Sequence, residues 1–519
     1  MSLARDITTV GGGTLLSRLL AFVRDAGIAA LLGSGPFSEA FFAVLQVVNF
    51  FRRLLAEGAL NSAFVPIWLT LRQAEDGAAN ADKFTKRALL AIGCITGIVV
   101  LLAIVFAPFV IAAIAPGFDA ARQEIASFYL MLVAPYVVLA GLVAVIAAAL
   151  NAEGRVGAVT VSTVMFNLVL VLALLVVFDS YIGQLEFSLW LCVAIVAAGL
   201  CQLLITGVTW LATGKRWRRV SLRVPDQTKA FFKRALPGLI AAGIPQLKLI
   251  AAAAIVSSSP AALSWLYYAN RLYELPLGVA SIAIAAVIVP RIAASIGSGD
   301  TDAFAAVQSR AYEIALGLAL PAAAGFALLA TPIAGGLFER GAFGANDTAA
   351  VAAALAAICA GLPGHVLEKV FGAVSFAHDD THTPMLAALT GLAAAILGAL
   401  LLFPHYGHVG VAAAIALSGW VGATLLGLIL YRRGWLRLDA SGWRRLPRIL
   451  LATAIMGAVV GYALTTGHAL FPALAASSLG RLGLLIVLVT LGVAVYLGAL
   501  QWLGVAKLKD IIASVRGKE

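Results

Sequence analysis

The segment NFFRRLLAEGALNSAFVP, residues 49–66, places two adjacent arginines and a glutamate in a stretch long enough to cross a lipid bilayer. A charged side chain at membrane depth costs at least about 2.5–3.5 kcal/mol, so it normally faces a water-filled cavity or an opposite charge. Further charges that interrupt apolar stretches are Arg18, Arg24, Asp25, Glu39, Lys248, Arg271, Glu274 and Lys369. Most of these charges fall in the first two apolar segments of each half of the chain, which indicates a shared function.

Helical spacing decides which of these charges can neutralise one another. Arg53 and Glu57 are four residues apart and Arg271 and Glu274 are three apart, so each pair can form along one helix face. Arg52 diverges by about 100° from its neighbour Arg53, so both side chains cannot point at the same centre. We expect Arg52 to face a cavity and Arg53 to be largely neutralised by Glu57.

Arginine remains in excess after this pairing. Arg18 and Asp25 are seven residues apart and share a helix face, whereas Arg24 lies about a third of a turn away. Arg24, Arg52 and Arg271 therefore have no obvious full-time partner. Because guanidinium groups bind phosphate in a bidentate way, the excess predicts an anionic, phosphorylated substrate. The alternative is that all of these charges form internal salt bridges that fix helix packing.

The composition of the chain requires a membrane around these helices. Of its 519 residues, 62% are hydrophobic and 12% are charged, and the mean hydropathy is +1.00. Soluble domains are about a quarter charged. The sequence therefore predicts an all-α polytopic membrane protein with about fourteen spans of roughly 20 residues or more. The expected spans are 7–33, 37–71, 86–114, 123–150, 156–178, 187–212, 230–256, 261–296, 303–332, 347–376, 383–403, 409–432, 444–466 and 478–504.

Lysine and arginine alternate between the two sides of these spans. Loops after even-numbered spans are basic, above all GKRWRRVSLRVPDQTK at 214–229, whereas loops such as GSGP, SSSP and PHYGH carry no lysine or arginine. The positive-inside rule then places both termini and the even-numbered loops in the cytoplasm. The net charge of +11 thus reflects topology and contact with anionic membrane lipids, which argues against a nucleic-acid partner.

A weak internal repeat suggests how the spans are grouped. Pro36 and Pro260 are 224 residues apart, and Pro66 and Pro290 are separated by the same 224. This offset moves the first two spans onto the seventh and eighth, which predicts two six-helix lobes in parallel orientation. The predicted domains are an N-lobe at 1–213, a basic cytoplasmic linker at 214–229, a C-lobe at 230–433, and a final helix pair with a cytoplasmic tail at 434–519.

Several segments, read in chain order, resemble the MurJ (MviN) family of lipid II flippases, part of the multidrug/oligosaccharidyl-lipid/polysaccharide (MOP) exporter superfamily. They are SRLLAFVRDAGIAALLG, NFFRRLLAEGALNSAFVP, SWLYYANRLYELPLGVASIAIAAVIVP and APGF, and the resemblance covers nearly the whole chain. It implies two lobes around a V-shaped central cavity, with the last two helices lining a groove for the undecaprenyl tail. The implied activity moves lipid II, a lipid-linked peptidoglycan precursor, from the cytoplasmic to the periplasmic leaflet of the bacterial inner membrane.

The resemblance also implies roles for individual residues. Glu39 stands where the family usually has aspartate, which keeps the charge, and Asn270 stands where relatives often have aspartate, which leaves the cavity more positive. The family's cavity arginines correspond to Arg18, Arg24, Arg52, Arg53 and Arg271. The substrate-binding set expected from the residues and the resemblance together is Arg18, Arg24, Asp25, Glu39, Asn49, Arg52, Arg53, Glu57, Asn270, Arg271 and Glu274.

Lys248 is the departure from the family that bears on ion coupling. Some relatives have a sodium site built from oxygen atoms of spans seven and eleven, but here span eleven offers little beyond Thr390 and span seven supplies the Lys248 ammonium. We hypothesise that Lys248 replaces a bound cation, which argues against a sodium site; the alternative is a lysine that snorkels or is paired elsewhere. No metal or cofactor is expected, and the membrane potential could reset an empty, positively charged cavity.

Three classes of function compete on this sequence. A flippase for lipid II, or for another lipid-linked oligosaccharide, explains the arginines, the topology and the extra helix pair. A multidrug exporter of the same superfamily should have an acidic cavity, because its drugs are cationic. A membrane glycosyltransferase should have a larger extramembrane domain than these short loops provide, so we do not expect an enzyme. We expect a monomer that interacts with the cell-wall synthesis machinery.

The stretch HDDTHTP, residues 378–384, carries side chains that could bind a metal ion. It lies in a predicted cytoplasmic loop, and its composition favours a solvated turn before a helix. A metal site is the weaker alternative.

Overall fold

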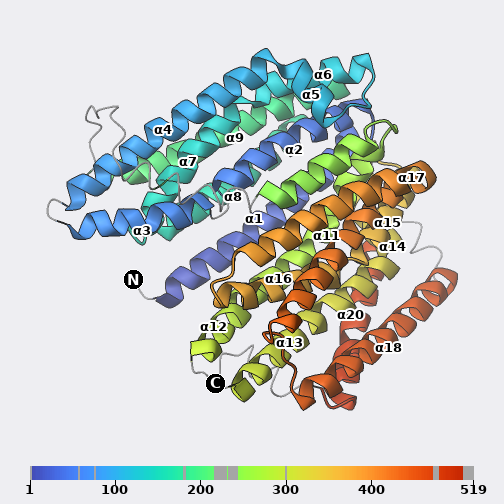
Figure 1. Ribbon diagram of the computed structural model, residues 1–519. Helices are drawn as coiled ribbons and strands as arrows, with labels where there is room; N and C mark the ends of the chain where they lie inside the picture. Colours follow the sequence, from blue (N-terminus) through green and yellow to red (C-terminus); the bar gives the residue numbers. More distant parts are fainter. Residues whose placement is uncertain are drawn as a thin grey trace. The chain divides into compact units, whose positions relative to one another are not determined.

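The protein is helical throughout the part of the chain that the structure describes. The computed structural model describes residues 3–56, 59–74, 77–178, 183–214, 231, 243–297, 301–470 and 478–505. None of these residues lies in a β-strand (Figure 1). Contacts divide the chain into two compact units: unit 1 is Met1–Ser264 with Arg340–Phe343, and unit 2 is Trp265–Glu339 with Gly344–Glu519. The predicted all-α class is confirmed.

Unit 1 contains the first nine labelled helices and an apolar helix at Gly243–Val256. Helix α1 packs on α8, α8 packs on α9, and α7 contacts both α4 and α9. Its aromatic core includes Phe64 stacked on Phe84, with ring centroids 4.9 Å apart and Phe231 at their edges. The helices are α1 (Leu3–Leu32), α2 (Pro36–Ala56), α3 (Ala59–Gln73), α4 (Gly77–Val105), α5 (Ala107–Ile114), α6 (Ala120–Val133), α7 (Pro135–Ala152), α8 (Val156–Phe178) and α9 (Gln184–Leu211).

Unit 2 contains the remaining labelled helices. Helix α16 packs on α17 and on α13, and the last two helices pack on each other, on α13 and on α14. The elements are α11 (Ala262–Ala283), the π-helical segment η1 (Ile284–Ile288), α12 (Val289–Gly297), α13 (Thr301–Leu328), α14 (Ala330–Phe338), α15 (Ala345–Cys359), α16 (Leu362–Ala377), α17 (His382–Arg432), α18 (Ala440–Leu470) and α20 (Ser478–Trp502).

Proline breaks several spans that the sequence predicts as continuous. Pro108, Pro135 and Pro363 each occupy one of the first two positions of a new helix, at the starts of α5, α7 and α16. Proline clashes with the preceding turn in a helix interior but fits the first turn, where its missing N–H has no helical partner to lose. The predicted spans 86–114, 123–150 and 347–376 are therefore helix pairs.

The predicted boundary between spans eleven and twelve lies inside α17. Its backbone is non-helical at Gly407, where φ is 55° and ψ is −140°. This positive φ favours glycine, because a side chain would meet the backbone there. A Cβ on Gly410 would lie 2.6 Å from the Leu402 carbonyl oxygen, so the two halves of α17 turn back closely on each other.

Each of the two spans predicted at 37–71 and 261–296 contains more than one labelled helical segment. Helix α2 ends at Ala56 and α3 begins at Ala59. At the corresponding place in the second repeat, α11 ends at Ala283 and passes through η1 into α12. The span predicted at 261–296 therefore contains a π-helical segment, and the repeat and its two lobes stay predictions.

Nine helices in the described ranges are long and apolar enough to cross a membrane. Their surfaces expose large apolar side chains, among them Leu401 at 72% and Val176 at 68%, which suits contact with lipid. The chain is thus a multi-pass membrane protein, while the count of fourteen spans stays a prediction.

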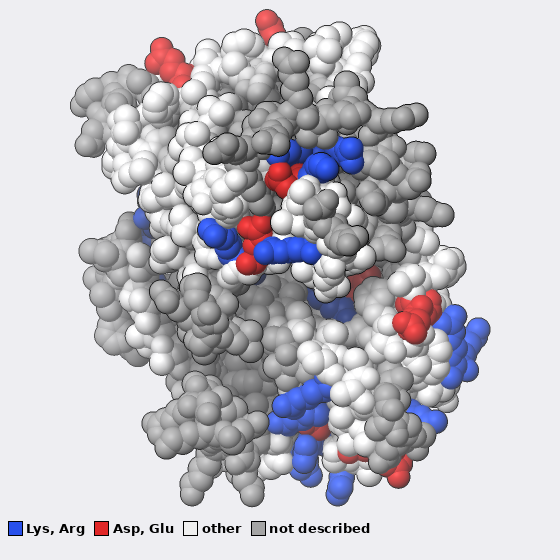
Figure 2. All heavy atoms as spheres, turned by 90° about the vertical axis from the view of Figure 1, so that its left-hand side faces the viewer, with Lys and Arg blue, Asp and Glu red and all other residues white. Residues whose placement is uncertain are grey.

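Basic side chains group with acidic ones on the surface. Figure 2 shows one face on which lysine and arginine gather, with aspartate or glutamate beside most groups. Glu313, for example, accepts from Arg310 at 3.0 Å and from Arg445 at 3.3 Å. The predicted linker 214–229 lies outside the described residues apart from Gly214, and the predicted domain boundaries stay predictions.

The HDDTHTP stretch forms a turn between α16 and α17 that is held by hydrogen bonds and an ion pair. The Asp380 carboxylate accepts from the backbone N–H groups of His382 and Thr383, both at 3.0 Å, and from the Thr383 hydroxyl. It also pairs with Arg433, directly after α17, so one side chain joins the two ends of the α17 hairpin. The His378 ring stacks on Trp435 with centroids 4.1 Å apart. The polar side chains of Asp380, Thr383 and His378 thus make contacts that stabilise the turn.

We expect Asp380→Asn to destabilise the protein at neutral pH. Burial opposes ionisation of Asp380, but hydrogen bonds from Thr383 and Arg433 outweigh it and hold the pKa at about 2, below the ordinary 3.8. The carboxylate therefore contributes stability above about pH 4, and this contribution is lost as the pH falls toward 2. Because Arg433 is partly exposed, the loss at pH 7 should be only about 1–2 kcal/mol.

The melting temperature of the purified protein in detergent, measured at pH 7 and at pH 3, checks this. The difference between wild type and Asp380→Asn should be largest at pH 7 and smaller at pH 3. Asp379→Asn is the matched control, because Asp379 is an exposed neighbour with φ of 59°, a conformation that asparagine tolerates. Equal melting temperatures of wild type and Asp380→Asn at pH 7 would contradict the assignment.

Candidate functional site

Arg24 is held inside unit 1 by its neighbour Asp25. Its Nε and Nη2 donate to Asp25 Oδ1 at 2.9 and 2.7 Å, and its Nη1 donates to Asn167 Oδ1 of α8 at 3.0 Å. The two charged side chains are 9% and 0% exposed. Asn167 Nδ2 in turn donates to the Ser17 carbonyl oxygen and hydroxyl, which ties α1 to α8. The expectation that Arg24 lacks a full-time partner is wrong.

The reason for this error is geometric. Adjacent helix side chains diverge, so spacing rules do not pair them, but a long arginine side chain can fold back to a carboxylate one residue on. Asn167 lies 143 residues from Arg24, so its contribution could not be read from local spacing. Arg18, by contrast, lies beside Ser17 with a side chain that is only partly buried.

The C-terminal end of α2 presents two arginines that keep partial exposure. Arg52 Nε donates to Asn49 Oδ1, one turn earlier, over a long 3.4 Å. Arg52 and Arg53 are both half-buried. The predicted partner of Arg53, Glu57, lies outside the described residues, so that pair stays a prediction.

Glu39, at the start of α2, forms a buried ion pair with Arg122. Arg122 Nη1 donates to Glu39 Oε2 at 3.0 Å, and the Glu39 side chain is 2% exposed. Arg122 Nε also donates to Asp119 Oδ2 at 3.0 Å. The backbone N–H of Arg122 donates to Asp119 Oδ1, which caps α6 and lowers the pKa of Asp119.

Tight backbone packing surrounds this ion pair. The Gly117 N–H donates to Ser257 Oγ at 2.9 Å, and a Cβ on Gly117 would lie only 2.3 Å from the Ser258 nitrogen. Ser38 and Ser264 hydroxyls are 3.1 Å apart. Glu39 therefore helps to join the starts of α2 and α6 to residues 257–264. We missed Arg122 in the sequence, although its three-residue spacing from Asp119, just after the APGF motif, was a usable signal.

Helix α11 of unit 2 carries another ion pair, whose side chains are more exposed. Arg271 Nη1 donates to Glu274 Oε2 at 3.2 Å, and the side chains are 27% and 25% exposed. The pairing predicted from their spacing is confirmed, and the expectation that Arg271 lacks a full-time partner is wrong. Asn270 precedes them with a half-buried side chain, and Lys248 is half-buried on the helix at Gly243–Val256.

The arginines thus divide into two groups by burial. Arg24 and Arg122 are almost fully buried, and their donors serve internal carboxylates. A second group, which we call the accessible arginines, is partly exposed and consists of Arg18, Arg52, Arg53 and Arg271. Chemically, the accessible arginines are suited to an anion that brings its own oxygen acceptors, because each residue keeps part of its surface exposed.

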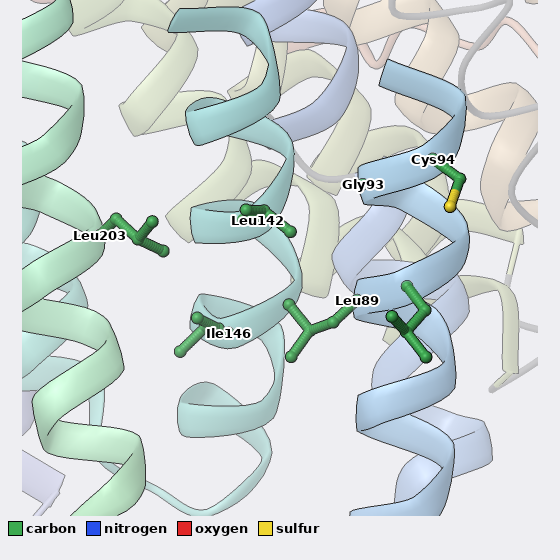
Figure 3. A pocket seen from close by; sticks show the side chains of 7 residues that line it. Leu89, Gly93, Cys94, Leu142, Ile146 and Leu203 are labelled. Carbon is green, nitrogen blue, oxygen red and sulfur yellow. The ribbon is translucent and has the colours of Figure 1, made fainter. Parts of the chain in front are cut away.

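A pocket of about 310 Å³ in unit 1 is unsuited to such an anion (Figure 3). It lies among α4, α7 and α9, and Figure 3 shows aliphatic side chains around it with the sulfur of Cys94 at one edge. A phosphate there would lose its hydration without gaining donors. Its lining residues are Leu89, Leu90, Gly93, Cys94, Leu142, Ile146 and Leu203.

Comparison with known proteins identifies the family. Residues 28–476 match the family described as lipid II flippase MurJ. A protein of Rhizobium meliloti (strain 1021) named "Probable lipid II flippase MurJ" is 36% identical, over 99% of this chain and 97% of its own. The chain belongs to the MurJ family. A family member from Burkholderia cenocepacia, named "Lipid II flippase MurJ", is 27% identical over 97% of this chain and 98% of its own.

Solved structures agree with the family's fold. The chain is similar to a lipid II flippase MurJ in an inward closed conformation, with a TM-score of 0.77 and 21% identity over 94% of this chain and 97% of that one. An inward-facing multidrug resistance MATE family transporter of the MOP superfamily gives a TM-score of 0.64 at 16% identity, over 80% of this chain and 94% of its own. The MurJ family fold is therefore shared with the wider superfamily, and the chain belongs to a family of transporters rather than of enzymes.

We expect the protein to lose much stability when one member of the Arg24–Asp25 pair is removed, and to lose less when apolar residues replace both. Asp25→Ala leaves the buried Arg24 guanidinium without its carboxylate, which should cost about 3–5 kcal/mol. The double change Arg24→Met with Asp25→Leu removes both charges and should recover most of that loss. Denaturant unfolding in mixed micelles measures both. A double variant that is less stable than Asp25→Ala alone would contradict the account.

Proposed function

We propose that this protein flips lipid II from the cytoplasmic to the periplasmic leaflet of the bacterial inner membrane, with both termini in the cytoplasm. The observation that carries the proposal is membership of the MurJ family over nearly the whole chain, in a protein that retains the arginine-bearing motifs. Lipid II carries a diphosphate between its undecaprenyl chain and its disaccharide-pentapeptide. A cationic binding site is the physical counterpart of that diphosphate.

The accessible arginines are the proposed contacts of the diphosphate. Arg52 and Arg271 lead this group, because both present partly exposed guanidinium groups from helices that the repeat relates to each other. Arg18 on α1 and Arg53 on α2 add further positive charge to unit 1. Arg24 takes a different role from the one its charge suggested: paired with Asp25 and Asn167, it fixes α1 against α8 and so positions the first helix.

Movement of the substrate requires that this grip be moderate. Each charge-assisted hydrogen bond contributes about 1.5–3 kcal/mol, so several fully desolvated contacts together would trap the headgroup. Partial exposure of Arg52 and of the Arg271–Glu274 pair supports a site that releases its ligand. We infer alternating access, in which the two lobes rock while the polyprenyl chain stays in lipid or along α18 and α20. The apolar surface of those helices, including Leu450 and Ile486, suits such a chain.

Drug export by the same fold is disfavoured by charge. MATE transporters share the architecture, but a cationic drug would meet the repulsion of the accessible arginines. Another lipid-linked oligosaccharide fits the same chemistry as lipid II and is separated from it by the experiment below. We further infer that the protein acts as a monomer and cooperates with the cell-wall synthesis machinery.

Replacing Arg52 should block flipping without unfolding the protein. In cells depleted of the protein and supplied with wild type or Arg52→Ala, we would measure how much lipid II a periplasm-restricted hydrolase can reach. Wild type should restore access, while Arg52→Ala should lower it at least about tenfold, as expected for one lost charged contact. Arg432→Ala is the matched control, because Arg432 is exposed in the last turn of α17.

Two outcomes would contradict this assignment. Full access in depleted cells would mean that another transporter moves lipid II, and another lipid-linked glycan would become the substrate to test. Equal access with Arg52→Ala and wild type would remove Arg52 from the path.

We expect flipping to depend on membrane potential but not on sodium. An empty cationic site responds to the potential by about 2.3 kcal/mol per charge per 100 mV, and the half-buried Lys248 supplies a fixed positive charge in place of a bound cation. Proteoliposomes containing lipid II, with a potassium diffusion potential in sodium-free buffer, provide the measurement. A flipping rate that does not change when the potential is collapsed would contradict the first part of this proposal. A flipping rate that requires sodium would contradict the second part.

A further inference from the structure

A second group of ionisable side chains lies within unit 2, on α11 and α16. We call it the His365 cluster; it consists of Tyr273 on α11 and His365 and Glu368 on α16. The Tyr273 hydroxyl oxygen lies 2.8 Å from His365 Nδ1, and the same nitrogen lies 3.0 Å from the Gly361 carbonyl oxygen. Tyr273 is 3% exposed, whereas His365 and Glu368 are partly exposed.

Helix α17 makes room for these two side chains with glycine. A Cβ on Gly419 would lie 2.6 Å from His365 Nδ1, and a Cβ on Gly422 would lie 2.9 Å from the Glu368 carboxyl carbon. The helices are in close contact here, since a Cβ on Gly361 would lie 2.4 Å from Ala416 Cα. An imidazole and a carboxylate therefore occupy a seam between helices that small apolar residues would fill equally well.

Ionisable side chains in such a place are costly to keep. An acid or base within a membrane-crossing helix is destabilising unless it has a partner or a function, and such residues commonly mark ion or proton pathways. His365 and Glu368 are three residues apart on one face of α16, within a stretch apolar and long enough to span the membrane. The diphosphate contacts proposed above do not use either residue.

We propose that His365 and Glu368 form a proton-binding site, and that Tyr273 couples its occupancy to helix α11. The coupling rests on the proposed function, because α11 also carries Arg271 and its partner Glu274. Proton binding itself stands independently of what the protein transports.

Proton transfer changes the hydrogen bonding of one atom. With the imidazole neutral and its hydrogen on Nε2, the Tyr273 hydroxyl donates to Nδ1. A proton taken from water onto Nδ1 makes that nitrogen a donor to the Gly361 carbonyl oxygen. Tyr273 then loses its acceptor and must turn its hydrogen elsewhere, while the Glu368 carboxylate balances the new charge. No electron moves, and the proton returns to water when the site empties.

The charged surroundings of the cluster support coupling through Tyr273. The ionisable side chains of Glu368, Glu274 and Cys359 lie near the Tyr273 hydroxyl. On α16, Lys369 interacts with Glu368. On α17, Gly419 lies against His365 and Gly422 lies against Glu368. Helix α13 carries the buried Tyr312, whose ring packs on Phe371. Helix α12 carries Arg291, which is exposed.

Ring resonances of histidine test the proton site directly. The chain has six histidines, so nuclear magnetic resonance of protein labelled on histidine, in detergent or nanodiscs, resolves few signals. Loss of one signal in His365→Asn assigns His365, and His405→Asn is the matched control at an exposed position. We expect the His365 ring to titrate between about pH 5 and 8. Glu368→Gln should move its midpoint down by about one pH unit or more, because the neighbouring negative charge is lost.

Tyr273→Phe separates the proposed hydrogen bond from simple packing, since it removes the hydroxyl and keeps the ring. This variant should change the nitrogen shift of neutral His365 and move its midpoint. A ring that stays neutral from pH 5 to 8, or a titration identical in wild type, Glu368→Gln and Tyr273→Phe, would overturn the proposal.

The coupling is tested by the pH dependence of flipping in proteoliposomes containing lipid II. The wild-type rate should change several-fold between pH 5.5 and 8, and His365→Asn should flatten this profile, whereas His405→Asn should not. A wild-type profile retained in His365→Asn would overturn the coupling. Absence of lipid II flipping by the wild type would defeat the proposed function and the coupling together, while the ring titration would still decide whether the site binds a proton.

Discussion

The cost of placing charge at membrane depth governs the organisation of this protein. Each buried cation must be neutralised by a partner or reached by water, and the chain uses both solutions. Arg24 and Arg122 are almost fully buried, and their guanidinium groups meet Asp25 and Glu39. The Arg122–Glu39 pair joins α6 to α2, and Arg24 also donates to Asn167 of α8, so the cost of burial is offset by defined packing between helices that are distant in sequence. Arg52 and Arg271 remain partly exposed, Arg271 in an ion pair with Glu274.

The helical class and the membrane setting could be predicted because both depend on composition and on local apolar length. The Arg271–Glu274 pair could also be predicted, since its partners are one turn apart. Glu39 and Arg122 are 83 residues apart, and Arg24 and Asn167 are 143 apart, so only the tertiary fold reveals these contacts. The broken spans were missed for another reason: apolar length does not register a proline such as Pro135, which ends one helix and begins the next.

Division of the arginines into buried and accessible groups refines the expectation drawn from their charge alone. The sequence offered two alternatives, a phosphate-binding set or a set of internal salt bridges. Arg24 follows the second alternative, and the accessibility of Arg52 favours the first. A transporter needs both, because a rigid first helix keeps the binding groups in register while partial hydration keeps ligand release possible. The His365 cluster adds an ionisable element to unit 2 that neither alternative contains.

The central claim is that cationic side chains recognise the diphosphate of a lipid-linked glycan. The most direct measurement compares initial flipping rates, in proteoliposomes, for lipid II and for a lipid with the same undecaprenyl chain and headgroup joined through a single phosphate. The account predicts that lipid II moves at least about tenfold faster, the equivalent of one lost charged contact. This preference should shrink in Arg52→Ala. Equal rates for the two lipids in the wild type would contradict the claim, because recognition would then rest on the glycan or the lipid chain.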